Sequence, residues 1–179
     1  RLPHCIDFEA NIYFRQENTG VLLGTYEPRS TPWSLDGTPQ NFGHDLLDPK
    51  LDRIADRLEL AFERIPALGT AGIKDKINGP FVFSPDGNPM IGPVPGVKNY
   101  WVAVGVMAGF CQAGGVGRSL SEWMIEGEPS IDVWAMDIAR FGSFATPQWG
   151  VIKSSENYER RFVMTFPNET LPKGRRQKT

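Results

Sequence analysis

Cysteine and histidine are scarce in this sequence of 179 residues, which has two of each. Cys5 and Cys111 are far apart, and no carboxylate or cysteine stands at a ligand-like offset from His4 or His44. We therefore expect neither a disulfide framework nor a metal site, and a reducing compartment is the default. A Ser-His-Asp or Cys-His constellation is also missing, and for Cys111 small-residue packing is favoured over a nucleophilic role.

Long hydrophobic runs and an excess of one charge are missing as well. The sequence has no stretch of about 18 consecutive apolar residues, and its start, RLPHCIDFEA, lacks the features of a signal peptide. The 19 basic side chains are dispersed and are balanced by 21 acidic ones, for a net charge of −2. We expect no membrane span and no nucleic-acid partner, and a composition with 40% hydrophobic residues is that of a soluble globular protein.

The first half of the sequence predicts a β-hairpin, a loop and a helix. Residues 12–14 and 21–26 predict two strands that a turn at residues 17–20 joins. Residues 28–42, rich in Pro, Ser, Thr and Gly, predict a loop. Apolar residues at helical spacing over residues 51–65 predict a helix that begins after Asp48-Pro49 and ends before Pro66.

The second half predicts strands, a glycine-rich bend and a long helix. We expect strands through Ile77 and over residues 81–83, then an SPDG turn in which Asp86 caps its own backbone. The apolar run at residues 100–106 predicts a strand covered on both faces. A bend over residues 107–115 and a helix over 116–125 follow, and Gly127 ends the helix. Residues 157–161 predict a helix and 162–166 a strand.

The glycine-rich bend, VMAGFCQAGGVG, offers a place for close approach of a ligand to the backbone. A strand that leads into glycines and a helix N-terminus presents N–H groups and the positive end of the helix dipole. The AGGVG spacing does not match GxGxxG. From spacing alone, an equally weighted alternative is that Gly114, Gly115 and Gly117 only permit tight packing of the helix on the strand.

Several stretches, in one consistent order, resemble the D-amino-acid-oxidase-like family of FAD-dependent oxidoreductases. SPDGNPMIGP, GVMAGFCQAGGVG and EWMIEGEP are similar to the C-terminal half of its flavin-binding module. The hairpin YFRQENTGVLLGTYE resembles the family's substrate-domain strands, and DVWAMDIARFGSFAT with ENYERRFVMTFPNE resembles the start of the following central domain. Within the family, the sequence is most similar to the dehydrogenases of dimethylglycine and sarcosine.

This resemblance implies a fold of the α+β or α/β class. It would be the C-terminal portion of a flavin-binding domain, with a mixed sheet and antiparallel substrate-binding strands, incomplete on its own. Residues 1–98 would form the substrate-binding strands and their connecting helix, 99–131 the FAD-contacting strand, bend and helix, and 132–179 the start of the central domain. Because the family's GxGxxG segment and flavin-bearing histidine have no counterpart here, we expect a piece of a longer or split enzyme. Its partner would be a GxGxxG segment, in the same or another chain.

The resemblance also implies site residues. FAD would be the cofactor, with no metal. Tyr13 is implied as the catalytic and substrate-binding side chain, with Arg15 on the same strand face as a second substrate-binding residue. An ordinary half-buried strand tyrosine is the open alternative for Tyr13. The FAD-binding residues would be Gly105, Val106, Met107, Ala108, Gly109 and Phe110 along the flavin edge, Gly114 and Gly115 opening the helix, and Met90, Ile91 and Gly92 near the same edge.

The implied reaction is oxidative demethylation of an N-methylated glycine, with hydride transfer to the flavin leaving an iminium ion. Two alternatives stay open. One is another flavin-dependent amino-acid or amine oxidase, and the other is a non-catalytic fragment or subunit that needs a partner chain. The expected location is the cytoplasm, or the mitochondrial matrix in a eukaryote.

Overall fold

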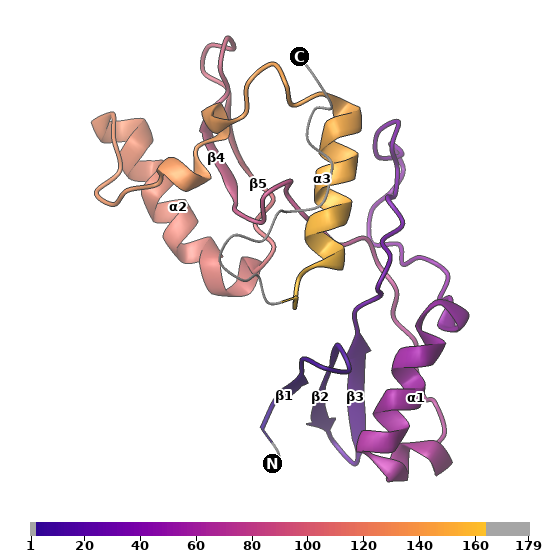
Figure 1. Cartoon of the computed structure of the whole chain (residues 1–179). Coiled ribbons are helices and arrows are strands. Elements are labelled where there is room, and N and C mark those ends of the chain that lie inside the picture. The colour runs from indigo at the N-terminus through magenta and orange to yellow at the C-terminus, as the bar shows by residue number, and fades with distance from the viewer. Residues whose placement is uncertain (1–2, 164–179) are drawn as a thin grey trace. The chain divides into compact units, whose positions relative to one another are not determined.

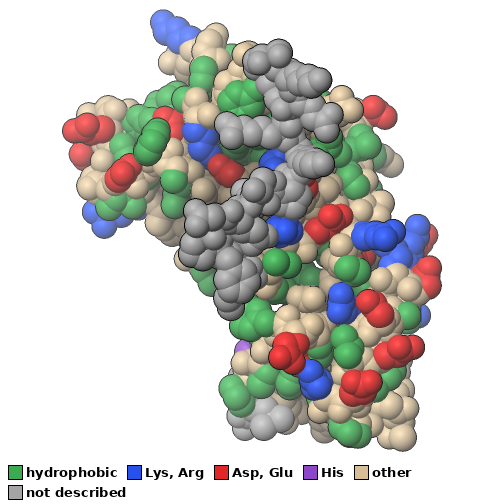
Figure 2. Space-filling view, viewed as in Figure 1, with side chains coloured by type: hydrophobic (Ala, Val, Ile, Leu, Met, Phe, Trp, Pro, Cys, Tyr) green, Lys and Arg blue, Asp and Glu red, His purple; other side chains and the backbone are tan. Residues whose placement is uncertain are grey.

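A computed structural model describes residues 3–163 of the chain (Figure 1). These residues form two compact units: residues 3–80 together with 159–163, and residues 81–158. Each unit combines strands and helices, which confirms the predicted mixed class of α and β structure. On the face shown in Figure 2, Lys and Arg side chains are interspersed with Asp and Glu. No helix of the described residues is long and apolar enough to cross a membrane.

The sheet of the first unit confirms the predicted hairpin. Strands β1 (Cys5–Asp7), β2 (Ile12–Glu17) and β3 (Gly20–Thr25) are antiparallel in the order β1-β2-β3. Ile12 lies opposite Thr25 and Glu17 opposite Gly20. The tight turn between β2 and β3 suits the sequence because Asn18 adopts a φ of 53°, a left-handed conformation that asparagine tolerates.

One face of this sheet packs on the helix α1 (Ala55–Arg64). Ile12 is 1% exposed and contacts Ala61, which is fully buried, while Phe14 packs around them. Period-2 alternation then sends Tyr13 and Arg15 to the opposite face. The helix prediction is confirmed, although the first turn is a 3-10 helix, η1 (Leu51–Ile54), and a second one, η2 (Pro66–Thr70), follows α1.

The second unit contains a two-stranded antiparallel sheet of β4 (Met90–Pro93) and β5 (Trp101–Val104). The strands predicted at residues 77 and 81–83 are wrong. These residues pair with no other strand of the described chain, and Ile77 is 79% exposed. β propensity alone forms no strand where no neighbour supplies hydrogen bonds.

The helix α2 (Gly109–Glu126) packs on β4, where Val116 joins Ile91 and Val133 in a core cluster (Figure 1). The predicted bend over residues 107–115 is wrong in its second part, because the helix begins at Gly109. Glycine costs helix stability, but burial of the face that bears Val116 offsets that cost. Gly127 ends the helix as predicted, with a φ of 91° and an N–H bond to the Trp123 carbonyl.

The prediction that residues 100–106 form a strand covered on both faces is also wrong. Val104 is 46% exposed and Ala103 is exposed. The described residues supply α2 as the helical cover of this two-stranded sheet, and a sheet needs a layer on each side to bury both faces.

The end of the described chain is helical. Two 3-10 turns, η3 (Trp134–Met136) and η4 (Ile138–Arg140), precede the helix α3 (Pro147–Glu159). The predicted helix at residues 157–161 is therefore confirmed at its start, as the end of a longer helix, and residues 160–161 form a turn. The strand predicted for 162–166 is not formed at residues 162–163, and residues 164–166 lie outside the described residues.

Candidate functional site

The chain leaves β5 through Gly105, which has a φ of +66°. A Cβ atom built on Gly105 would lie 3.2 Å from the Met90 Cε and 3.2 Å from the Ser84 Cβ. Glycine is therefore required for both its left-handed backbone and its tight surroundings. This bend carries the chain from β5 into the N-terminus of α2.

The N-terminus of α2 has no acidic group to neutralise it. The N-cap residue, Ala108, makes no side-chain hydrogen bond, and the first turn contains no Asp or Glu. The Ala108 carbonyl accepts the N–H groups of Cys111 and Gln112, each at 2.9 Å. The positive end of the helix dipole therefore stays available to a negatively charged group.

The glycines of α2 do not serve packing on β4 or β5. A Cβ built on Gly109, Gly114, Gly115 or Gly117 meets no atom within 4 Å among the described residues. The alternative that Gly114, Gly115 and Gly117 exist for tight packing is thus not supported within this unit. Gly114 and Gly115 lie in the second turn, so their predicted position at the opening of the helix is wrong.

The other predicted cofactor residues differ in exposure. Phe110 is fully exposed, whereas Val106, Met107 and Ala108 are half-buried around the bend. Three predicted residues lie on β4: Met90 is half-buried, Ile91 is fully buried in the core, and Gly92 faces the Trp123 ring, 2.7 Å from a built Cβ. Contact of any of these residues with a cofactor stays a prediction.

In the first unit, the Tyr13 ring lies over the neighbouring strand, β3. It pairs with Gly24, and a Cβ built on Gly24 would stand 2.0 Å from the Tyr13 Cζ. The rings of His4 and Tyr26 are 5.8 and 5.7 Å from that of Tyr13. Burial raises the pKa of Tyr13, and its hydroxyl has no hydrogen-bond partner among the described residues. The phenol is therefore protonated at neutral pH and free to donate.

Arg15 shares the strand face of Tyr13, opposite Leu22. Its guanidinium binds the Glu17 carboxylate at 3.0 Å, so its charge is paired. The structure brings Tyr13 and Arg15 together in the first unit, and brings the bend at Gly105 and the start of α2 together in the second.

Sequence reasoning missed the contacts that hold the SPDG turn beside the bend. Ser84 is 1% exposed, and its carbonyl accepts the Asn157 Nδ2–H at 2.9 Å. Asp86 accepts the Asn88 N–H, as expected for a turn that caps itself, and also two hydrogen bonds from Arg140 at 2.8 and 2.9 Å. Arg140 and Asn157 are too distant in the sequence to give a local signal.

Lowering the pH is expected to destabilise the second unit through Asp86. Burial acts to raise the pKa of Asp86, but the Arg140 hydrogen bond and the Asn88 N–H outweigh it, so the pKa lies below its ordinary value of 3.8. The contribution is full above 3.8 and is lost as the pH falls through the lower folded value. Because the Asp86 side chain is 37% exposed, Asp86→Asn should cost only about 1 kcal/mol at neutral pH.

Urea unfolding over a series of pH values measures this effect. The difference in unfolding free energy between wild type and Asp86→Asn should shrink toward zero as the pH falls below 3.8 and through the lowered folded-state pKa of Asp86. Glu126→Gln, a change of an exposed carboxylate at the end of α2, is the control. A difference that is the same at every pH would show that the ion pair does not contribute.

Comparisons with known proteins find similar sequences for nearly the whole chain. The family model described as FAD dependent oxidoreductase matches residues 1–123, and the model described as FAD dependent oxidoreductase central domain matches residues 126–179. Mouse mitochondrial dimethylglycine dehydrogenase is 42% identical over 97% of this chain, and human mitochondrial sarcosine dehydrogenase is 30% identical over 97%. The chain spans 21% and 19% of these relatives.

A solved structure is similar as well. L-proline dehydrogenase from P. horikoshii has a TM-score of 0.59 and 26% identity, and the match covers 78% of this chain and 35% of that one.

Proposed function

This chain belongs to the family of FAD dependent oxidoreductases, and on that premise we propose that it is part of an enzyme that oxidatively demethylates an N-methylated glycine. The similarity to dimethylglycine dehydrogenase, at 42% identity over 97% of the chain, carries this proposal. Since the chain spans about a fifth of such relatives, the active enzyme would include further segments, among them a GxGxxG segment in the same or another chain.

FAD is the cofactor of the family, and the residues at the start of α2 fit a flavin. The fit rests on an uncapped helix N-terminus without acids, on the left-handed bend at Gly105, and on helical glycines at which a built Cβ would meet no other part of the described chain within 4 Å. When bound, FAD accepts the electrons of the oxidation.

The role of this chain's own residues would be to bind FAD and to stabilise negative charge on it. The bend at the buried Gly105 directs the chain into α2, and Gly109 leaves room beside the helix N-terminus because it has no side chain. The N–H groups and dipole of α2 would stabilise negative charge on the bound group. Gly114 and Gly115, in the next turn, likewise present no side chain on the surface of α2.

The substrate site would involve Tyr13 and Arg15 on the face of β2 that is opposite α1. The Tyr13 phenol, whose pKa is raised by burial, is protonated at neutral pH, and its hydroxyl would donate a hydrogen bond to the substrate. Arg15 would attract the substrate carboxylate once its bond to Glu17 exchanges. Tyr13 would act by orienting the amine for hydride transfer.

The names of the three similar dehydrogenases support the proposed substrate class. Dimethylglycine, sarcosine and L-proline are amino acids whose nitrogen carries more than one carbon substituent. An N-methylated glycine is proposed over proline because the identity to dimethylglycine dehydrogenase is the higher. We keep residues 1–98, 99–131 and 132–179 as the proposed division into substrate-binding, FAD-contacting and central-domain parts. The two relatives are mitochondrial, so a mitochondrial matrix location is proposed for a eukaryotic source.

Anaerobic reduction of the flavin tests the function. The full-length protein should be yellow, and dimethylglycine or sarcosine should bleach its flavin absorbance faster than L-proline does. Faster bleaching by proline would favour the alternative of another amino-acid oxidase. A protein without flavin would favour a non-catalytic subunit.

Tyr13→Phe is expected to lower kcat/KM for an N-methylated glycine by several-fold to about tenfold, with flavin content unchanged. The loss corresponds to one hydrogen bond of about 0.5–1.5 kcal/mol. If the hydroxyl orients the amine only during hydride transfer, the rate of flavin reduction falls and substrate affinity does not. Rapid mixing under anaerobic conditions separates the two. Tyr100→Phe, which removes an exposed hydroxyl, is the control, and equal reduction rates in both variants would return Tyr13 to an ordinary strand tyrosine.

A further inference from the structure

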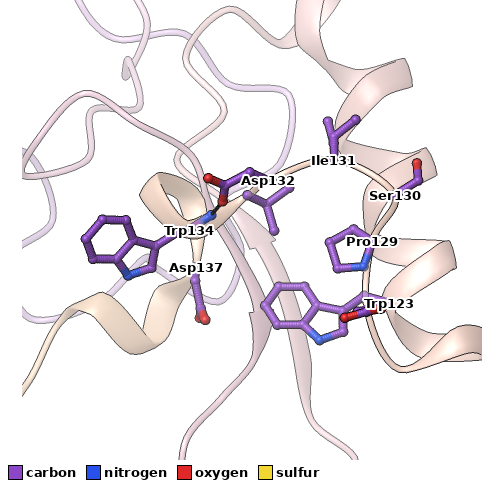
Figure 3. Close-up of a pocket in the computed structure, with 9 residues that line it drawn as sticks. Trp123, Pro129, Ser130, Ile131, Asp132, Trp134 and Asp137 are labelled. Carbon is purple, nitrogen blue, oxygen red and sulfur yellow. Dashed lines mark hydrogen bonds between the residues drawn. The ribbon is translucent and has the colours of Figure 1, made fainter.

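The second unit has a cavity, open to solvent, at the end of α2 and remote from Gly109. It is about 420 Å³ in volume and is lined by Trp123, in the last turns of α2, and by residues 128–134 and 137 (Figure 3). A helix of this length spans roughly 27 Å, so the cavity is separate from the proposed flavin site. Its volume is within the range of small-molecule sites.

The charged side chains of this cavity are all acidic. They are Glu128, Asp132 and Asp137, and the nine lining residues include no Lys, Arg or His. Asp132 Oδ1 accepts the Trp134 N–H at 2.9 Å. Asp137 Oδ1 accepts the Ala139 N–H at 2.7 Å. One oxygen of each of these two carboxylates stays without a partner in the described chain, so the cavity offers fixed negative charge.

A nearby cation does not neutralise these carboxylates. Arg140 donates to the main-chain carbonyl of Asp137 and not to its carboxylate. The same guanidinium is paired with Asp86 through two hydrogen bonds. The acidic cavity therefore keeps its net negative charge.

Two indole rings complete the lining. Trp123 is fixed by an edge-to-face contact with Trp101, at 5.8 Å between centroids, and by its contact with Gly92. Trp134 is 80% exposed and makes no ring contact with another described aromatic residue. Figure 3 shows the two indoles on either side of Asp137.

Indole faces and carboxylates together select an organic cation. The ring quadrupole attracts positive charge, methyl groups pack on the ring, and the carboxylates supply the counter-charge. A divalent metal would instead require a shell of several oxygen ligands and would gain nothing from two indoles. We propose that this cavity binds a small methylated ammonium ion.

Isothermal titration calorimetry of the full-length protein tests this binding, with choline as the probe. The comparison ligand is 3,3-dimethylbutan-1-ol, which has the shape of choline and no charge. Choline should bind with one site per chain, and the neutral alcohol should bind at least about tenfold more weakly. Equal affinity for the two ligands would overturn the proposal.

Two variants assign the binding to this cavity. Trp134→Ala should weaken choline binding by about 3- to 30-fold, as expected for loss of a cation–π contact. Asp132→Asn should weaken it by about fivefold while it keeps an oxygen that accepts the Trp134 N–H. Circular dichroism of each variant checks the fold, and if Trp134→Ala does not fold, Asp132→Asn alone decides.

Matched changes just outside the lining are the controls. Ile125→Ala removes an exposed apolar side chain, and Glu126→Gln removes an exposed carboxylate, both at the end of α2. Neither should alter the affinity for choline. Absence of saturable binding, or binding that all four variants leave unchanged, would overturn the proposal. Binding that perturbs the flavin spectrum and is insensitive to Trp134→Ala would assign choline to the flavin site and also overturn it.

Discussion

Gly109→Val in the full-length protein is expected to abolish flavin retention and to leave the second unit folded. The fold should tolerate valine because a Cβ at Gly109 meets no described atom within 4 Å, and glycine is itself a poor helix former. A flavin that lies against the start of α2 would collide with the branched side chain. A clash of about 1–3 kcal/mol lowers FAD affinity by roughly 5- to 150-fold, which is enough to lose the cofactor on purification if binding is not covalent.

The ratio of flavin to protein absorbance measures this loss, and far-ultraviolet circular dichroism checks the fold. Gly150→Val is the matched control, because Gly150 is also a helical glycine with no atom within 4 Å of a built Cβ, on α3. We expect the control to keep its flavin. Full flavin occupancy in Gly109→Val would place the cofactor elsewhere, and flavin loss in both variants would indicate a general effect of valine on these helices.

Gly24→Ala is expected to impair catalysis by moving Tyr13. The new methyl group would stand 2.0 Å from the Tyr13 Cζ and 2.3 Å from its hydroxyl oxygen, so the ring must leave its position. The end of a tyrosine side chain moves more easily than a paired strand does, and we expect the sheet to persist with a loss of stability of about 1–3 kcal/mol. If Tyr13 orients the substrate, kcat/KM should fall by at least the factor expected for Tyr13→Phe, several-fold to about tenfold.

A double-mutant cycle tests this mechanism. In a Tyr13→Ala background, the further change Gly24→Ala should have little effect on kcat/KM, because no ring remains to be displaced. Gly20→Ala, in the same strand, is the control, since its Cβ would meet only the Glu17 carbonyl oxygen, at an ordinary 3.7 Å. Additive losses from the Tyr13 and Gly24 changes would mean that Gly24 acts independently of Tyr13.

Local patterns predicted the elements that depend on neighbours in the sequence. The hairpin of β2 and β3 follows from the turn around Asn18 and from period-2 alternation, which also placed Tyr13 and Arg15 on one face. The helix α1 follows from apolar residues at helical spacing. The resemblance in the motifs around the SPDG turn and α2 predicted the family, which the family models confirm.

The predictions that are wrong, and the contacts that were missed, concern features that depend on residues distant in the sequence. Whether residues 77–83 form a strand depends on a pairing partner, and the described chain offers none. The start of α2 depends on the packing of Val116 against Ile91 and Val133, which outweighs the cost of the glycines. The pair of Asp86 with Arg140 and the bond of Asn157 to Ser84 join residues that no sequence spacing relates.

The contacts of Arg140 and Asn157 with the SPDG turn have a consequence for folding cooperativity. The family models divide the chain between residues 123 and 126, yet residues 81–158 form one compact unit that contains parts of both segments. Truncation at that division would remove the guanidinium that pairs with Asp86 and the amide that binds Ser84, and Ser84 packs directly beneath Gly105. We therefore expect residues 81–123 and the helices of residues 126–158 to unfold together, so limited proteolysis should cut near residues 123–126 only after the whole unit has opened.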